Sequence, residues 1–298
     1  MKKVIVGGML VCAVVLICIG SINSFSPMVS VLEEEEFEVD GIEMLNFQTT
    51  AADIEIELSS SDRITVKLEG KIGKKLKNKF RLKIDEDGDQ LKVSYLSNDN
   101  RLGIQLGSEK DMTLSVTLPE RTYKELAVYT TSGNIDAVSV SAGNINLKSV
   151  SGNQDIKKFT SEDTLSIQST SGDIELGRNV MNDFSIRSTS GNVKIEELVS
   201  RSGKINSNSG NVNVIIEEMI NSLDVITKSG NVKASFKDNP ESLKIDFKGI
   251  SGEPDIKLRD IMYEEKSENS AIGIIGDGSK TINVKTTSGD FTAEGWSH

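Results

Sequence analysis

The chain has 298 residues, of which 37% are hydrophobic and 5% aromatic, with 25 glycines and 4 prolines. Its 45 acidic and 34 basic residues give a net charge of −11, which disfavours nucleic-acid binding. The only histidine is His298 and the only cysteines are Cys12 and Cys18, so a Cys/His metal site and a Ser/His/Asp triad are excluded. Short apolar runs separated by Gly, Ser, Thr, Asn and Asp predict an all-β fold.

The N-terminal segment differs from the rest, because an uncharged apolar run over residues 4–22 follows Lys2 and Lys3. At 1.5 Å per residue this run spans about 28 Å, close to the hydrocarbon core of a bilayer, and the lysines place the N-terminus in the cytoplasm. We therefore expect residues 1–26 to be a single-pass anchor in the cell membrane, preceding an extracytoplasmic domain. A cleaved signal peptide is the alternative, although Pro27 would then follow the cut.

The remainder divides by composition. Residues 27–36, which contain EEEE, are predicted to be an acidic linker. Residues 37–298 are predicted to form one β domain, irregular over 37–120 and repetitive over 121–298. Within the irregular part, RLKIDEDGDQLKVSY predicts a hairpin that turns at residues 85–89.

The repeat is visible in IQSTSGDIEL, which starts at Ile167 and returns as IRSTSGNVKI from Ile186. A degenerate copy occurs at Ala52. Successive steps between its glycines are 19 to 22 residues as far as Gly252, and the last step is 37 residues. This period predicts a β-solenoid (β-helix) of about 19–20 residues per coil. The aligned glycines are Gly133, Gly152, Gly172, Gly191, Gly210, Gly230, Gly252 and Gly289.

Apolar residues alternate on both sides of each glycine, which predicts one strand before and one strand after it, each with a single buried face. We interpret the glycines as structural corner residues, because glycine adopts positive φ without steric strain. The Ser before the glycine and the Asn or Asp after it are expected to bond to local backbone. Stacking the coils about 4.8 Å apart would join the apolar columns into one core.

The third residue after each glycine should point outward. A solvated acidic strip at Asp136, Asp155 and Glu175 is the simpler interpretation, and a weak divalent-cation site is the alternative. No other metal, no cofactor and no catalytic residue is predicted. In chain order the column is Asp136, Asp155, Glu175, Lys194, Asn213, Lys233 and Asp255.

The segments MTLSVTLPE and YKELAVYTTSGNIDA, the TSGNI and TSGDI copies and the final INVKTTSGDF resemble a bacterial family of unknown function named for "putative adhesins". That family includes membrane-anchored envelope-stress operon proteins of the LiaG type. The resemblance covers roughly residues 37–293. It implies a repetitive β architecture and carries no catalytic residues over to this chain.

We therefore expect a non-enzymatic, membrane-anchored, extracytoplasmic adhesin-like or envelope-stress interaction module. Its expected partners are the membrane, through residues 4–22, and an envelope protein or cell-wall polymer. Open strand edges would also allow self-association. The alternative is a carbohydrate-active β-helix enzyme that acts on envelope polysaccharide through paired carboxylates.

Overall fold

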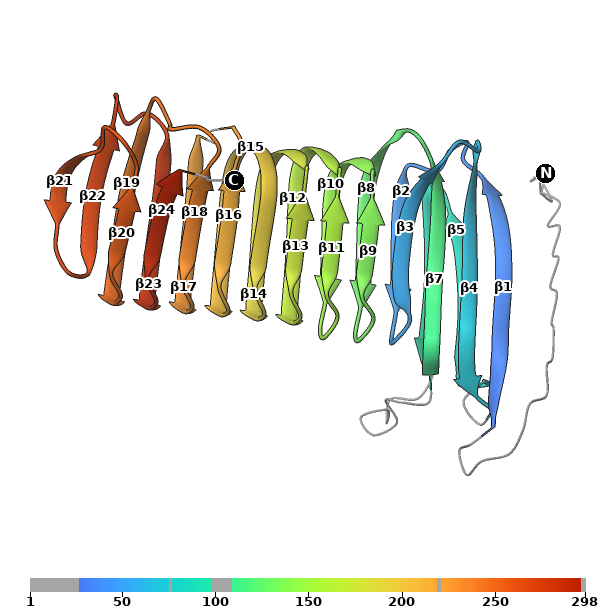
Figure 1. The fold of residues 1–298 in the computed structure, drawn as a ribbon. Helices are drawn as coiled ribbons and strands as arrows, with labels where there is room; N and C mark the ends of the chain where they lie inside the picture. Colours follow the sequence, from blue (N-terminus) through green and yellow to red (C-terminus); the bar gives the residue numbers. More distant parts are fainter. Residues whose placement is uncertain (1–26, 75–76, 98–108, 219–220, 296–298) are drawn as a thin grey trace.

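The computed structural model describes residues 27–74, 77–97, 109–218 and 221–295, and this part of the chain folds into 24 β-strands (Figure 1). It contains no helix of the length and hydrophobicity needed to span a membrane. The helix predicted over residues 4–22 lies outside the described residues. The prediction of an all-β, solenoid-like fold is confirmed.

Two long mixed sheets, A and B, run along the molecule and pack face to face. In spatial order sheet A consists of β1 (Met28–Glu38), β4 (Arg63–Gly73), β7 (Glu109–Pro119), β3 (Asp53–Ser59), β9 (Ile135–Val138), β11 (Gln154–Lys157), β13 (Ile174–Gly177), β15 (Val193–Ser209), β16 (Val212–Ile216), β18 (Val232–Phe236), β24 (Phe291–Gly295) and β20 (Pro254–Lys257).

Sheet B consists of β5 (Phe80–Asp87), β6 (Gln90–Ser97), β2 (Met44–Thr49), β8 (Thr122–Thr130), β10 (Ser141–Ser149), β12 (Thr160–Ser171), β14 (Val180–Ser190), the second half of β15, β17 (Ser222–Ser229), β23 (Thr281–Ser288), β19 (Leu243–Ser251), β22 (Ser270–Ile275) and β21 (Met262–Lys266). Strand β15 is long because it belongs to sheet A in one coil and to sheet B in the next.

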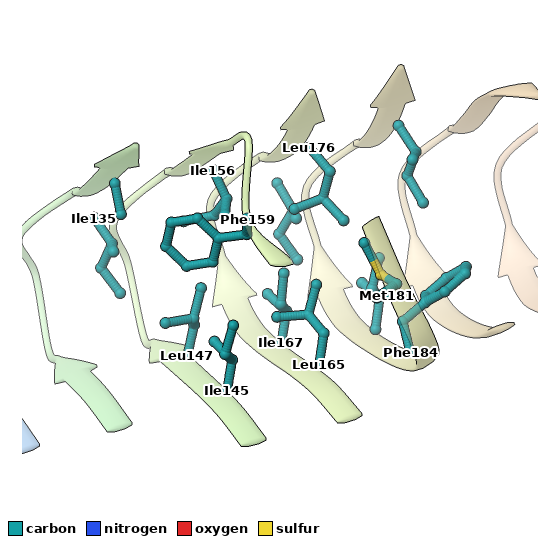
Figure 2. Close-up of a cluster of buried hydrophobic side chains, with 14 of the residues drawn as sticks. Ile135, Ile145, Leu147, Ile156, Phe159, Leu165, Ile167, Leu176, Met181 and Phe184 are labelled. Carbon is teal, nitrogen blue, oxygen red and sulfur yellow. The ribbon is translucent and has the colours of Figure 1, made fainter. Parts of the chain in front are cut away.

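Each coil contains a sheet B strand, a corner at the repeat glycine and a sheet A strand. Parallel pairing places equivalent residues of successive coils side by side, as with Leu147 and Ile167 in sheet B. Ile135, Ile156 and Leu176 project from sheet A toward these side chains, and all five are buried (Figure 2). The period-two alternation of the sequence therefore produces the continuous apolar core.

The C-terminal coils are not stacked in chain order. The last coil, β23–β24, lies between the coil β17–β18 and the coil β19–β20, so that Ile282 is paired with Leu223 on one side and Ile245 on the other (Figure 1). After β20 the chain forms the β21–β22 hairpin, antiparallel to β19, and then returns to fill the space. This path explains the 37-residue step. Lys233 and Asp255, which follow each other in the outward column predicted from the sequence, are not neighbours, because Thr292 lies between them.

The N-terminal end is capped differently. The coil β2–β3 is the first of the stack, and beyond it the strands β6 and β7 are followed by the antiparallel strands β5, β4 and β1. The hairpin predicted around residues 85–89 is confirmed as β5–β6.

The predicted acidic linker over residues 27–36 is instead part of a strand. Strand β1 pairs with β4 along its full length, and Val29, Val31 and Phe37 pack against the core. Four consecutive glutamates conceal this alternation in the sequence. They are tolerated because β1 is an edge strand, where charge also discourages pairing with another chain.

Candidate functional site: the corner columns and the outer faces

The eight corner glycines form one column along the stack. A Cβ built on any of them would lie 1.7–2.3 Å from the carbonyl oxygen of the corner residue in the preceding coil. Only Gly191, Gly210, Gly230 and Gly289 have a positive φ, between +125° and +154°. The shared requirement is therefore the close approach of two backbones rather than the left-handed conformation expected from the sequence. Ala52 occupies the first position of the column, so its Cβ meets no preceding corner.

The residue after each glycine forms a hydrogen-bond ladder. The Oδ1 atom of each Asn or Asp accepts a hydrogen bond, of 2.7–3.0 Å, from the backbone N–H of the equivalent residue in the next coil. Asn and Asp serve equally because both supply this oxygen. The ladder runs through Asp53, Asn134, Asn153, Asp173, Asn192, Asn211, Asn231 and Asp290 and ends at Glu253.

A buried hydroxyl, three residues before the glycine, completes the corner. The hydroxyl of Ser169 donates to the carbonyl of Gly172 at 3.0 Å, and that of Ser149 donates to the carbonyl of Gly152 at 2.7 Å. Ser171, directly before its glycine, is exposed. The sequence interpretation assigned this role to the wrong serine, although Ser or Thr recurs at the buried position in every coil except that of Gly249.

Left-handed backbone does occur, at the opposite corner. The sixth residue after the glycine has φ between 52° and 63° in four successive coils, at Ser139, Lys158, Arg178 and Glu197. Sequence reasoning missed these positions because none of them is a glycine.

The predicted acidic strip lies on the outer face of sheet A. Asp136, Asp155 and Glu175 are paired in register on β9, β11 and β13, and Glu55 of β3 adds a fourth acid before them. Lys157 Nζ lies 2.5 Å from an oxygen of Asp155. Lys194 Nζ lies 3.0 Å from Glu175 Oε1.

Asp136 forms no ion pair in the part of the chain that the structure describes. Desolvation by the surrounding coils and the negative charges of Asp155, Asp53 and Glu55 raise its pKa, and Lys157 opposes this shift. In the part of the chain that the structure describes, no group of three or more acidic, cysteine or histidine side chains is arranged to hold a metal ion. The strip is therefore a row of carboxylates on an open face, and the geometry does not assemble a cation site from it.

The described surface has a shallow hollow at the far end of the stack, between the corner at Gly252 and the turn at residues 267–269. Its carboxylates are those of Glu253 and Glu268, both exposed. Six strands of sheet A separate β20, at this hollow, from β9, which carries Asp136. The acidic strip and the hollow are therefore separate features.

The two sheets extend over nearly all of the described chain, and residues 42–294 match the Toastrack DUF4097 family. The protein belongs to this family. No curated protein matches it.

Among solved structures, this Toastrack chain is similar to a "putative adhesin" from Bacteroides fragilis NCTC 9343, at 15% identity with a TM-score of 0.51, over 89% of this chain and 97% of that one. It also matches a "putative adhesin" from Parabacteroides merdae ATCC 43184, at 13% identity with a TM-score of 0.41, over 89% and 96%. A "putative lipid binding protein" from Parabacteroides distasonis ATCC 8503 matches at 13% identity with a TM-score of 0.38, over 89% and 97%. At these identities, the first likeness supports the Toastrack fold alone.

Proposed function

We propose that the protein is a non-enzymatic, adhesin-like interaction module of the bacterial envelope, held at the cell membrane by residues 4–22 with its solenoid outside the cytoplasm. The observation that carries the proposal is the repetition of outward side chains in register along two flat faces. Such faces present the same kind of contact at intervals of about 4.8 Å, which suits adhesion to a long or repetitive partner. The membership of the Toastrack family and the adhesin names of its structural neighbours support the same role.

The carbohydrate-active enzyme is the second candidate, and one observation favours it. Asp136, with its raised pKa, lies in register beside Asp155, which is paired with Lys157. Two neighbouring carboxyl groups, one of them with a raised pKa, are the kind of pair that glycoside hydrolysis uses. Against it, the pair stands on the open outer face of sheet A rather than in the hollow at Gly252, so nothing around it would hold a sugar ring in position or exclude water.

Binding and cleavage are separated by one experiment. Incubating the full chain with isolated envelope polymers should retain the protein on the polymer without releasing soluble fragments. Release of fragments that is lost in Asp136→Asn would support the enzyme instead. Failure to retain the protein on any envelope fraction would refute the adhesin-like module.

The anchor is tested independently. Protease added to intact cells should digest the solenoid, while the N-terminal segment stays with the membrane fraction. Recovery of mature protein that begins near Pro27 in the medium would refute retention by residues 4–22.

A further inference from the structure

The outer face of sheet B differs in charge from that of sheet A. We define the sheet B face as the residues two, four and six positions before the corner glycine, in the coils of Gly133 through Gly289. These positions alternate with the buried columns and so point to solvent. The acidic residues among them are Asp224 and Asp246, and Asp246 lies 3.3 Å from Lys248 Nζ. Besides Lys248, the basic residues, all exposed, are Lys148, Arg187, Lys204, Lys228 and Lys285.

These five cations lack carboxylate partners. None of them forms an ion pair in the described part of the chain, and Lys148 Nζ lies 5.8 Å from the centre of the Tyr129 ring. The carboxylate of Asp224 instead accepts a hydrogen bond from Asn283 Nδ2 at 2.8 Å. The cations of the sheet B face are therefore free to bind an external anion.

Sheet A shows the opposite arrangement. In the stacked coils from β9 to β24, its outward lysines are each held by a carboxylate: Lys157 by Asp155 at 2.5 Å, Lys194 by Glu175 at 3.0 Å and Lys233 by Glu294 at 2.7 Å. The two faces of one acidic protein thus differ: the lysines of the sheet A coils are neutralised by carboxylates, whereas five cations of sheet B form no ion pair, although Asp224 lies in register beside Lys204.

The cations are spread along the axis of the stack. Register places Lys148, Gln168, Arg187, Asn206, Ile226 and Lys285 at consecutive positions of one row. At about 4.8 Å per strand, Lys148 and Lys285 are about 24 Å apart. Lys204 and Lys228 flank this row, two residues before Asn206 and two residues after Ile226. A row of this length exceeds any small anion and matches an extended one.

We propose that the sheet B face binds an extended anionic polymer of the envelope, whose negative groups pair with Lys148, Arg187, Lys204, Lys228 and Lys285. This inference rests on the proposed adhesin-like function and names the chemistry of its partner. The neighbouring Asn, Ser, Thr and Gln side chains supply neutral hydrogen bonds to the polymer between its charges. The acidic face of sheet A repels the same polymer, so charge alone selects the face that binds.

The test uses the full chain in a neutral detergent, with inorganic polyphosphate as the probe and orthophosphate as the monomeric control. Polyphosphate should bind and orthophosphate should not, because single contacts on an exposed face are weak. With five charge contacts, affinity should fall roughly 100-fold as salt rises from about 50 to about 200 mM.

Two variants with the same change in net charge separate the faces. Arg187→Gln/Lys204→Gln/Lys228→Gln removes three positive charges from sheet B and should weaken polyphosphate binding at least about tenfold. Lys157→Gln/Lys194→Gln/Lys233→Gln removes three positive charges from sheet A. It should change the affinity for polyphosphate by no more than about twofold, since those lysines are already paired. Matching melting temperatures would show that both variants are folded.

Equal losses in the two variants, absence of polyphosphate binding, or binding only to anionic lipid vesicles would each overturn the inference. Retention on isolated envelope polymers separates this result from the proposed function. If the protein is retained but polyphosphate does not compete, the polyanion is the wrong partner and the adhesin-like module stands. If it is not retained, the proposed function itself fails.

Discussion

At the scale of single residues, the corner glycines are constrained by their neighbours in space rather than by their own φ. A Cβ on Gly172 would lie 2.3 Å from the carbonyl oxygen of Gly152. A Cβ on Gly177, in the same coil, would meet only Lys157 Cγ at 3.5 Å, an ordinary contact. Two glycines five residues apart therefore differ in what they tolerate.

We predict that Gly172→Ala destabilises the protein by about 2–3 kcal/mol, because two coils must separate at the corner. Gly177→Ala is the matched control and should change stability by no more than about 0.5 kcal/mol. Thermal or urea unfolding measures both. Similar small effects for the two variants would mean that the coils are not in close contact at Gly172.

Asp136 on sheet A and Asp183 on sheet B should contribute to stability with opposite dependence on pH. The pKa of Asp136 is raised above 3.8 by desolvation and neighbouring acids, so its contribution to stability falls as pH rises through the interval above 3.8. Hydrogen bonds from Ser202 and Arg201 lower the pKa of Asp183, so its contribution is present above 3.8 and is lost as pH falls below it.

Asp136→Asn should therefore raise the melting temperature at neutral pH, with a gain that shrinks in acid. Asp183→Asn should lower the melting temperature at neutral pH, with a loss that also shrinks in acid. Melting curves at several pH values compare the two. A shift of the same sign in both variants at neutral pH would contradict the assignment of their surroundings.

At the scale of elements, the ladder of Asn and Asp joins each coil to the next through side chain and backbone. Asn211 Oδ1 accepts a hydrogen bond of 2.9 Å from the N–H of Asn231. Asn211→Ala removes the hydrogen-bond acceptor and should lower the free energy of unfolding by about 1 kcal/mol. Asn211→Asp keeps Oδ1 and should leave the free energy of unfolding almost unchanged. Glu253→Ala, at the end of the ladder, should also leave it almost unchanged. Chemical denaturation tests the series, and an equal cost for Ala and Asp would exclude the ladder as the cause.

Much of the element order was predictable from the period of the glycines and the apolar columns, but the positions of the caps were not. Residues 27–36 were misread because consecutive glutamates obscure the alternation of Val29, Val31 and Phe37. The outward acids were placed correctly on one face, whereas the unpaired cations of sheet B were not recognised, since pairing depends on which lysines have a carboxylate within reach.

The sequence nevertheless holds a signal of spatial order. Every interior coil has a corner glycine, an Asn or Asp directly after it, and a Ser or Thr three residues before it. The exceptions to these three columns are Ala52 at the corner, Glu253 after it and Gly249 before it. Ala52 belongs to the first coil of the stack, and Gly249 and Glu253 belong to the coil that is last in space. The coil of Gly289 obeys all three columns although it is last in the chain, because it has a neighbour on each side.

At the scale of the whole molecule, the last coil of the chain connects the stack to its C-terminal cap. Strands β17 and β19 both pair with β23, and the described residues contain no direct pairing between them. Truncation before residue 281 should therefore release residues 243–275, while the coils over residues 135–195 stay folded. Hydrogen exchange would report fast exchange in the first range and protection in the second.

Deleting residues 240–277 is the matched control. It removes the coil that is last in space and leaves a link between β18 and β23 similar in length to that between β16 and β17. The shortened chain should keep β17, β18, β23 and β24 protected. Protection of residues 243–275 in the truncated chain would show instead that β19 can pair with β17 directly.

Because the interior coils are alike and the caps are distinct, the length of the molecule can change without a change at either end. An interior coil meets both neighbours through the same corner carbonyl, the same ladder and the same apolar columns, so a further coil inserted between β9 and β18 would find its contacts ready and leave both ends unchanged. Each insertion would move the two caps apart by about 4.8 Å. The distance between the two caps is therefore set by the number of interior coils, in steps equal to the spacing between hydrogen-bonded strands.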